Sequence, residues 1–461
     1  MRRTLTGATV IALLLGAAPA SAAVRAEAPP GPVPRLAPSA VDRLPWLARQ
    51  LGRQTLPERD GWAAEGAGTT GGSAATPERT AVVHSRADLV AALGGDNASN
   101  ATDATPKLIY VDGAIDGFEG PDGTPLSCAE LADPAYRLDA YLAAYDPAVW
   151  GRVAPSGPLE EARVRSVTNQ THQTQINVGP NTTIVGLHGA RLTGLTLMID
   201  RASNVIVRNL TLVDTRDCFP AWSPTDGENG NWNSQYDQIS VRRSENVWVD
   251  HNSFSDGDNP DSTQPVHFGR RYQVHDGSLD VTHTASLVTA SWNRFTGRDK
   301  LMLIGSSNTV GPDLGRLRVT LHHNLFDGVL QRLPRVRFGQ VDVYNNHYRL
   351  GGDDFQYALG VGVQSAIHAQ NNFFSLDPSL DPADLLYDWG GTALTERGSW
   401  VRRGGGPARP VDLLAAYNAT HDPDLGADAG WTPTLRRDPV LPTPLVPLVV
   451  NPLAGADWLP L

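Results

Sequence analysis

Lysine is almost absent from this chain of 461 residues. Lys107 and Lys300 are the only lysines among the 38 lysine and arginine residues, so arginine supplies nearly all of the basic charge. Because arginine differs from lysine in shape and hydration, the lysine at position 300 is conspicuous. The formal net charge is −11, which does not suit general nucleic acid binding, and we expect no nucleic acid partner. An acidic chain can still bind a polyanion where its cations are concentrated locally.

Cysteine is also scarce, and its two copies are Cys128 and Cys218. In an oxidising compartment these two residues are the candidates for one disulfide. The alternative is a pair of buried free thiols.

Long apolar runs are missing once the first residues are passed. Residues 1–22 have the three parts of a secretory signal peptide: an arginine pair, an apolar stretch from Ala8 to Ala18, and the small residues Ala20-Ser21-Ala22. We predict that cleavage leaves Ala23 as the first mature residue and that the protein is secreted and extracellular. No later stretch approaches the roughly 18 apolar residues of a membrane helix, so we expect no membrane association after cleavage.

The second half of the chain contains a repeat. Six short strings combine an apolar run with a closing Asn-x-aromatic pattern, the first copy being looser: VIVRNLTL (205–212), VWVDHNSF (247–254), VTASWNRF (288–295), VTLHHNLF (319–326), VDVYNNHY (341–348) and IHAQNNFF (367–374). The asparagines of the five regular copies are 41, 31, 22 and 26 residues apart: Asn252, Asn293, Asn324, Asn346 and Asn372. Repetition at such periods is typical of a solenoid.

Each copy is too short and too β-branched for a helix, and its alternation is that of a strand with one buried face. In stacked coils the asparagines form a ladder whose donors and acceptors satisfy one another, with the aromatic residues stacked beside them. The expected fold is therefore all-β, a right-handed parallel β-helix. The alternative is a β-sandwich with coincidental asparagine turns, although sandwiches favour strand spacings near 8 to 12 residues.

The composition of the chain after the predicted signal peptide indicates a lead-in followed by one long domain. Residues 23–71 are rich in Pro, Ala, Gly and Arg, and we expect a partly disordered lead-in. Residues 72–461 form one β-helix domain, because stacked coils escape the size limit of a single globular core. An insertion with helix-compatible segments interrupts the β pattern near residues 122–165. A Pro-rich tail from about residue 404 is expected to wrap the outside.

Three carboxylates flank the first regular coil. Asp237 ends the string Gln235-Tyr236-Asp237, and Asp276 and Asp280 lie four residues apart on a turn. Hard divalent cations prefer oxygen ligands, and Ca²⁺ accepts flexible carboxylate cages completed by water, so a calcium site is expected. Asp-Gly is also an ordinary turn, and Asp256-Gly257-Asp258 is a competing candidate.

Basic residues gather in the string Gln331 to Gly339, where Arg332 and Arg337 lie on either side of Pro334. Residues at odd spacing in a strand face opposite ways, but Pro334 interrupts the ladder, so both arginines can reach one groove. A lyase acting on uronates needs a base and cations for the carboxylates. The alternative is that these arginines only pair with surface acids.

Several long strings resemble the secreted bacterial pectate lyases: GNWNSQYD (230–237), VWVDH (247–251), GRRYQ (269–273), KLMLIGS (300–306) and QRLPRVRFG (331–339). The resemblance extends more loosely from about residue 61 to residue 372 and is lost beyond about Ser375. It implies Ca²⁺-dependent anti β-elimination on α-1,4-linked polygalacturonate, which leaves 4,5-unsaturated oligogalacturonides. We also expect an alkaline optimum, because an arginine acting as a base must lose its proton, and a monomer.

Site roles carry over from the resemblance by position. Asp237, Asp276 and Asp280 match the family's calcium-binding aspartates. Arg332 matches the arginine proposed as catalytic base. Lys300 and Arg337 match residues that contact substrate carboxylates. The residues of the motif at 247–251 are expected to be structural.

Three other functions remain open at this point. A pectin lyase acting on methyl esters would need no calcium, and the intact set of three aspartates argues against it. A polygalacturonase shares the β-helix but hydrolyses with paired carboxylates. A non-catalytic carbohydrate-binding solenoid would need none of the arginine, lysine and aspartate constellation.

Overall fold

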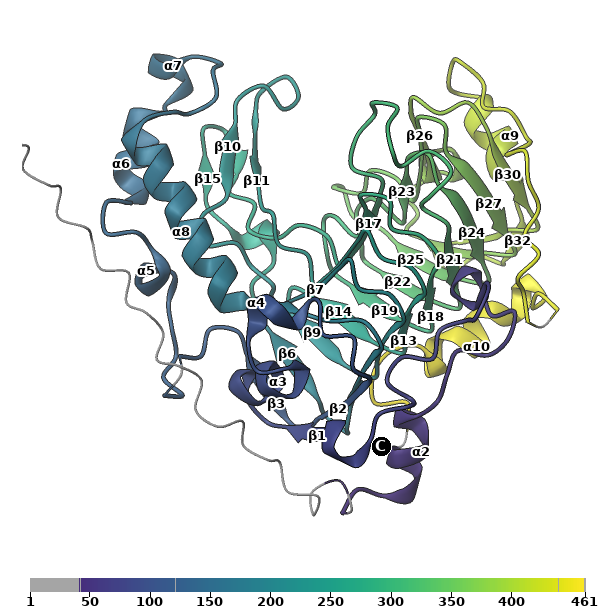
Figure 1. Cartoon of the computed structure of the whole chain (residues 1–461). Coiled ribbons are helices and arrows are strands. Elements are labelled where there is room, and N and C mark those ends of the chain that lie inside the picture. The colour runs from purple at the N-terminus through teal and green to yellow at the C-terminus, as the bar shows by residue number, and fades with distance from the viewer. Residues whose placement is uncertain (1–40, 42, 121, 438, 460–461) are drawn as a thin grey trace, which may run out of the picture. The chain divides into compact units, whose positions relative to one another are not determined.

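A computed structural model of the chain describes residues 41, 43–120, 122–437 and 439–459 (Figure 1). The predicted signal peptide of residues 1–22, its cleavage site before Ala23 and the lead-in up to residue 40 lie outside the described residues.

Three stacks of short strands dominate the fold, and each is named here by its first strand along the chain. The β1 sheet consists of β1 (Thr80–Val83), β2 (Lys107–Val111), β5 (Thr182–Gly186), β8 (Val205–Arg208), β13 (Val247–Asp250), β18 (Val288–Ser291), β21 (Val319–His322), β24 (Gln340–Tyr344), β27 (Ala366–Gln370) and β30 (Leu394–Arg397). The β3 sheet consists of β3 (Ala114–Asp116), β6 (Arg191–Thr193), β9 (Thr211–Val213), β14 (Ser253–Ser255), β19 (Arg294–Thr296), β22 (Leu325–Asp327), β25 (His347–Leu350), β28 (Phe373–Leu376), β31 (Trp400–Arg403) and β32 (Arg409–Pro410). The β4 sheet consists of β4 (Gln175–Asn177), β7 (Thr196–Asp200), β12 (Ile239–Arg242), β17 (Leu279–Thr282), β20 (Leu303–Ile304), β23 (Arg335–Val336), β26 (Leu359–Gly362) and β29 (Leu386–Trp389).

Successive coils stack in parallel register. One coil passes through β12, β13 and β14, and the next through β17, β18 and β19, so each sheet receives one strand from every coil. Apart from the final pair β31 and β32, the neighbouring strands of these sheets are parallel. The predicted parallel β-helix is thus confirmed, and the β-sandwich alternative is wrong.

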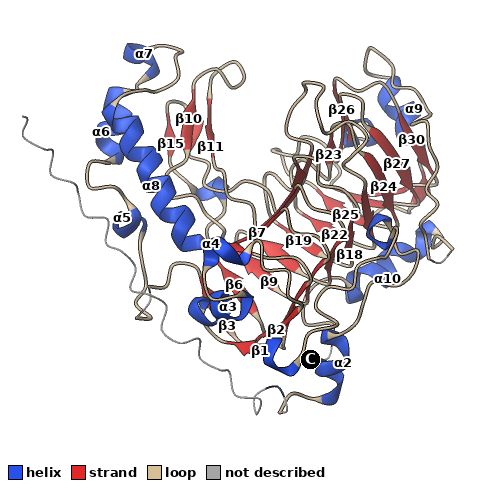
Figure 2. Ribbon diagram, in the orientation of Figure 1, coloured by secondary structure: helices blue, strands red, loops and turns tan. Residues whose placement is uncertain are grey.

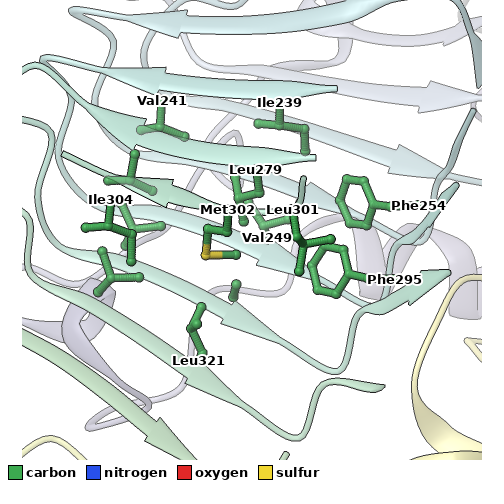
Figure 3. Packing of buried hydrophobic residues seen from close by; sticks show 14 of the residues in the cluster. Ile239, Val241, Val249, Phe254, Leu279, Phe295, Leu301, Met302, Ile304 and Leu321 are labelled. Carbon is green, nitrogen blue, oxygen red and sulfur yellow. The ribbon is translucent and has the colours of Figure 1, made fainter. Parts of the chain in front are cut away.

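The inward side chains of all three sheets form one apolar core. Figure 3 shows Ile239, Val241, Leu279 and Ile304 from the β4 sheet meeting Val249 and Leu321 from the β1 sheet and Phe254 from the β3 sheet. Alternate residues of each strand point inward, because the side chains of a strand alternate between its two faces. The same alternation leaves Ser240 and Asp280 on the outer face of the β4 sheet.

The predicted asparagine ladder lies at the turn between the β1 and β3 sheets. In the middle of the ladder, Asn324 Oδ1 accepts from the backbone N–H and the side-chain amide of Asn293, at 2.9 and 3.1 Å. Its Nδ2 donates to Asn346 Oδ1 at 3.0 Å and to the Ala290 carbonyl at 2.9 Å. The looser first copy places Leu210 at this position, and its N–H donates to Asn252 Oδ1, which ends the ladder.

Aromatic rings stack two residues further along each copy. Successive ring centroids lie 4.8, 5.3, 4.6 and 4.6 Å apart along the series Phe254, Phe295, Phe326, Tyr348 and Phe374. The rings are fully buried in the core and hold the coils in register.

Helices lie outside the stacked sheets (Figure 2). The stretch that the sequence marks as an insertion contains α5 (Cys128–Leu131), α6 (Leu138–Ala144), α7 (Pro147–Trp150) and the first half of α8 (Pro158–Thr174). Their apolar residues pack on the hairpins β10 (Ala221–Ser223) with β11 (Asn231–Asn233) and β15 (Val266–His267) with β16 (Arg270–Arg271). The disulfide predicted between Cys128 and Cys218 is present and ties this flank to the coils.

The remaining helices cover the other surfaces: α2 (Trp46–Gly52), η1 (Trp62–Ala64), η2 (Pro77–Arg79), α3 (Arg86–Leu93), α4 (Asn97–Asn100), η3 (Asp261–Thr263), η4 (Pro382–Leu385), α9 (Leu413–Asn418), η5 (Thr443–Leu445) and α10 (Val446–Leu453). Residues 46–71 of the lead-in pack on the outer face of the β1 sheet, and α10 packs on the β3 sheet. In the described part of the chain, the helices are too short or too polar to cross a membrane.

Candidate active site

A cleft of about 300 Å³ crosses the outer face of the β4 sheet. Its floor is made by alternate residues of successive strands, among them Thr196, Met198, Ser240, Asp280 and Leu303. The cleft therefore crosses the strands, and residues from several coils line a single groove.

Two of the three predicted calcium ligands, Asp237 and Asp280, line this groove, and the charge of Asp276 acts on both of them from beside it. Asp280 lies on β17, and Asp237 lies in the loop before β12, the neighbouring strand. Asp237 Oδ1 accepts from the N–H of Gly277 at 3.1 Å, and a β-carbon at that glycine would collide with Oδ1 of Asp280. Glycine at 277 thus leaves room for the two carboxylates to approach each other.

Their proximity perturbs their acidity. Burial, followed by the charge of Asp276, raises the pKa of Asp237 to about 7. Burial and the charges of Asp237 and Asp276 raise the pKa of Asp280 well above its ordinary value, although Arg332 opposes this. Both shifts have the physical causes expected for acids that share a small, poorly solvated space.

The donor set fits a hard divalent cation. Asp237 and Asp280 approach each other over Gly277, the charge of Asp276 acts on both, and Oδ1 of Asp276 is buried without a hydrogen-bond partner among the described residues. No set of three acidic, histidine or cysteine side chains in the described ranges has the spacing of a completed metal site. Carboxylate oxygens with room for water are nevertheless the ligands that Ca²⁺ accepts, and a cation between them would relieve their mutual repulsion.

Two predicted cationic residues lie beside the same carboxylates. Asp276 Oδ1 is 3.5 Å from Arg332 Nη1 and 3.8 Å from Lys300 Nζ. Both cations are largely buried, and Lys300 and Gln331 lie on neighbouring coils joined by a parallel bridge. The structure thus brings together five of the six predicted site residues on four coils.

Arg332, the residue predicted to be the base, lies in an unusual environment. Its backbone has a φ of 61°, in the left-handed region, immediately before the Leu333-Pro334 bond. Burial disfavours its charge, but Asp276 and Asp280 outweigh this effect and raise the pKa of the guanidinium above its ordinary value. Neutralising those two carboxylates would leave burial as the dominant influence and lower that pKa.

Arg337, the sixth predicted residue, lies just past β23. Its Nε donates to Asn308 at 2.6 Å and its Nη1 donates to the carbonyl of Gly305 at 2.7 Å. Burial, followed by the charges of Arg335 and Arg332, lowers the pKa of Arg337 to about 10. Three arginines therefore share one electropositive patch beside the acidic groove.

Sequence reasoning missed two arginines near this site. Arg335 stands in the same string as Arg332 and Arg337, and its spacing of two from Arg337 was a usable signal. Arg298 gave no such signal, because only the fold places it against the loop that carries Asp276. It is fully buried, donates to the carbonyl of Asp276 at 2.7 Å, and pairs with Asp256 at 2.7 Å.

The ion pair between Arg298 and Asp256 also argues against Asp256-Gly257-Asp258, the competing candidate for the calcium site. Asp256 is buried against Arg298 and lies 3.7 Å from Nδ1 of His275, whereas Asp258 is exposed. The Asp256-Gly257-Asp258 turn is therefore committed to a structural ion pair below the groove and does not supply a pair of free carboxylates.

Comparisons with known proteins identify the relatives of this chain. A family model described as pectate lyase matches residues 154–383. A pectate lyase of Bacillus subtilis is 43% identical over 394 residues, which cover 84% of this chain and 90% of the relative. Among solved structures, a thermostable pectate lyase is 46% identical with a TM-score of 0.86, and a pectate lyase bound to a hexasaccharide is 41% identical with a TM-score of 0.82. Each covers 88% of this chain and 99% of its own.

Proposed function

This chain belongs to the pectate lyase family and is a polysaccharide lyase, and from that premise we propose how and where it acts. It is a secreted enzyme that cleaves α-1,4-linked polygalacturonate by calcium-dependent β-elimination and releases 4,5-unsaturated oligogalacturonides. The observation that supports this proposal best is the convergence of Arg332 and Lys300 on Asp276, beside the groove that is lined by Asp237 and Asp280.

Arg332 is the proposed base. It takes the proton from carbon 5 of a galacturonate residue, the electron pair of that C–H bond forms the double bond between carbons 4 and 5, and the bond from carbon 4 to the glycosidic oxygen breaks. The departing oxygen then needs a proton from water. Arg332 lies at the edge of the acidic groove, next to both the carboxylates and the other two arginines of the patch.

Lys300 and Arg337 prepare the proton for removal. The carbon-5 proton is a poor acid because the adjacent carboxylate is negative, and fixed cations that pair with this carboxylate stabilise the charge that develops. Lys300 is buried and Arg337 is held by two hydrogen bonds, so both side chains lose little conformational freedom when substrate binds.

Asp237, Asp276 and Asp280 are the proposed ligands of Ca²⁺. The ion would supply a positive charge for the substrate carboxylate and would cancel the aspartate charges that now raise the pKa of Arg332. With those charges neutralised, the buried guanidinium loses its proton more readily, which favours catalysis at alkaline pH.

The first test is ultraviolet absorbance of the unsaturated product formed from polygalacturonate at alkaline pH, with Ca²⁺ or with a chelator. We expect a calcium-dependent rise that Arg332→Ala reduces by at least about 10³-fold, since the proton acceptor is lost. Arg316→Ala, at an exposed arginine outside the groove, is the matched control. Full activity of Arg332→Ala, or a rate maximum near pH 5 to 6, would reject Arg332 as the base.

The same assay separates the alternatives. New reducing ends without the ultraviolet signal would indicate hydrolysis, as in a polygalacturonase. Chelator-insensitive cleavage of methylated pectin would indicate a pectin lyase. Binding without any cleavage would indicate a carbohydrate-binding solenoid.

A further inference from the structure

Beyond the arginine patch, the outer face of the β4 sheet changes from charged to aromatic. The register row that contains Arg335 on β23 continues through Gly360 on β26 to Tyr387 on β29. Trp389 lies on the same face, two residues after Tyr387. Of these strands, only β29 lies beyond Ser375. The sequence resemblance to known lyases was expected to end there, but the similarity to the Bacillus subtilis pectate lyase covers 84% of the chain and therefore extends past Ser375.

The rings of Tyr357, Tyr387 and Trp389 form a tilted aromatic cluster over a glycine floor, and its exposed part, Tyr387 with Trp389, is called the platform here. The ring centroids of Tyr387 and Trp389 are 4.7 Å apart, and those of Tyr357 and Tyr387 are 5.5 Å apart. A β-carbon at Gly360 would lie 2.8 Å from the ring of Tyr357 and 3.1 Å from that of Trp389. Glycine therefore lets both rings lie against the backbone, while Tyr387 remains 45% exposed.

A cation stands at the edge of this platform. The guanidinium carbon of Arg335 is 3.8 Å from the ring centroid of Trp389, a cation–π contact that fixes the orientation of the arginine. Its Nε is buried and has no hydrogen-bond partner within the described ranges. Arg335 also adds to the electropositive patch of Arg332 and Arg337.

We propose that Tyr387, Trp389 and Arg335 form a distal subsite for one uronate residue of the substrate. A pyranose ring presents C–H groups that carry partial positive charge, and these groups suit the negative face of an aromatic ring. The carboxylate of the same sugar suits Arg335. Charge complementarity therefore selects an anionic sugar over a neutral one.

Distance decides which substrates reach this subsite. Strand β29 is two strand spacings, or about 10 Å, from β23 beside the proposed base. An oligosaccharide whose last residue lies over Arg332 does not reach the platform, whereas one that continues toward β29 extends across it. The proposal rests on the lyase function proposed above.

The test compares hexagalacturonate with trigalacturonate as substrates of the full chain. For Tyr387→Ala we expect the ratio of kcat/KM on the hexamer to kcat/KM on the trimer to fall about 3- to 10-fold, through KM, as one ring contact is lost. Trp46→Ala removes another exposed aromatic ring, on α2, and is the control. An unchanged ratio, or equal losses on both substrates, would overturn the subsite.

A binding experiment keeps this test separate from the lyase proposal. If wild-type protein cleaves neither oligomer, the lyase function fails, and calorimetric titration with hexagalacturonate still examines the platform. Weaker binding by Tyr387→Ala than by wild type supports the subsite, and equal binding rejects it. Arg335→Gln should also weaken hexamer binding, and should do so less at high salt, because its contribution is electrostatic.

Discussion

At the scale of single residues, the V-W-V-D-H motif at 247–251 has a structural role. Asp250 lies on the outer face of the β1 sheet, a different sheet from the one that carries the groove. It accepts from Arg208 at 2.7 Å and from Ser291 at 2.7 Å, and it contacts His251 at 2.8 Å. Burial opposes its charge, but these partners lower its pKa to about 2.

Asp250→Asn should lower the free energy of unfolding by about 3 to 5 kcal/mol at neutral pH, because it leaves Arg208 buried without its counter-charge. The folded pKa lies below the ordinary 3.8, so this stabilisation is present above about pH 4 and is lost as pH falls toward 2. Urea unfolding of both proteins across this range checks the prediction. A gap that stays constant down to about pH 2 would contradict the assigned cause, and Asp258→Asn, at an exposed acid, is the control.

At the scale of elements, the turns between the β1 and β3 sheets stabilise the stack of coils through their ladder asparagines. Each regular turn uses one residue in the left-handed conformation, such as His251 or His323, directly before its ladder asparagine. The asparagine then bonds to the coils on both sides, so the side chain replaces backbone hydrogen bonds that the turn cannot make. A single ladder residue therefore belongs to three coils at once.

Asn324→Ala should be among the most destabilising changes at these turns. It removes four hydrogen bonds and leaves buried groups of Asn293, Asn346 and Ala290 with fewer partners, at about 1 to 3 kcal/mol for each unsatisfied group. We expect a total loss of about 3 to 5 kcal/mol, measured by urea unfolding. Asn418→Ala removes bonds to Leu425 in the C-terminal segment and should cost about 1 kcal/mol. Similar losses for both variants would show that the ladder is not special.

At the scale of the whole molecule, the groove joins coils that the sequence separates widely. Asp237, Asp276, Lys300 and Arg332 precede four neighbouring strands of the β4 sheet, β12, β17, β20 and β23. A cation held by the three aspartates would link adjacent coils and replace repulsion between carboxylates with attraction. Binding at this site should therefore stabilise the solenoid as well as prepare it for catalysis.

Ca²⁺ at about 100 times its Kd should stabilise the wild-type protein by about 2.7 kcal/mol, which a thermal melt would register as a rise in Tm. Asp280→Asn should abolish most of this rise, because it removes a ligand charge. The variant should also match or exceed wild type in Tm under chelation, since one of the mutually repelling carboxylates is gone. An undiminished calcium response in Asp280→Asn would reject the proposed ligand set.

The sequence alone was sufficient for the repeat and the solenoid, and it suggested the six residues whose roles in the groove are proposed above. The periodic apolar strings and the Asn-x-aromatic pattern are local features of the sequence. Each copy predicts one strand and the turn after it, and the repetition of the copies predicts the stacked fold. The six predicted site residues were found through strings that resemble a family. Arg335 was within reach as well, because strand alternation relates it to Arg337.

Only the tertiary structure decided which distant residues act on one another. Arg298 reaches the carbonyl of Asp276, and Tyr357 meets Tyr387 and Trp389, because stacking in register brings successive coils within about 4.8 Å. The raised pKa of Arg332 likewise depends on Asp276 and Asp280, which lie more than 50 positions earlier. The sequence pattern specifies which side chains each coil exposes on its faces. The register between coils sets the distances between side chains of different coils, and electrostatic energies and contacts depend on those distances.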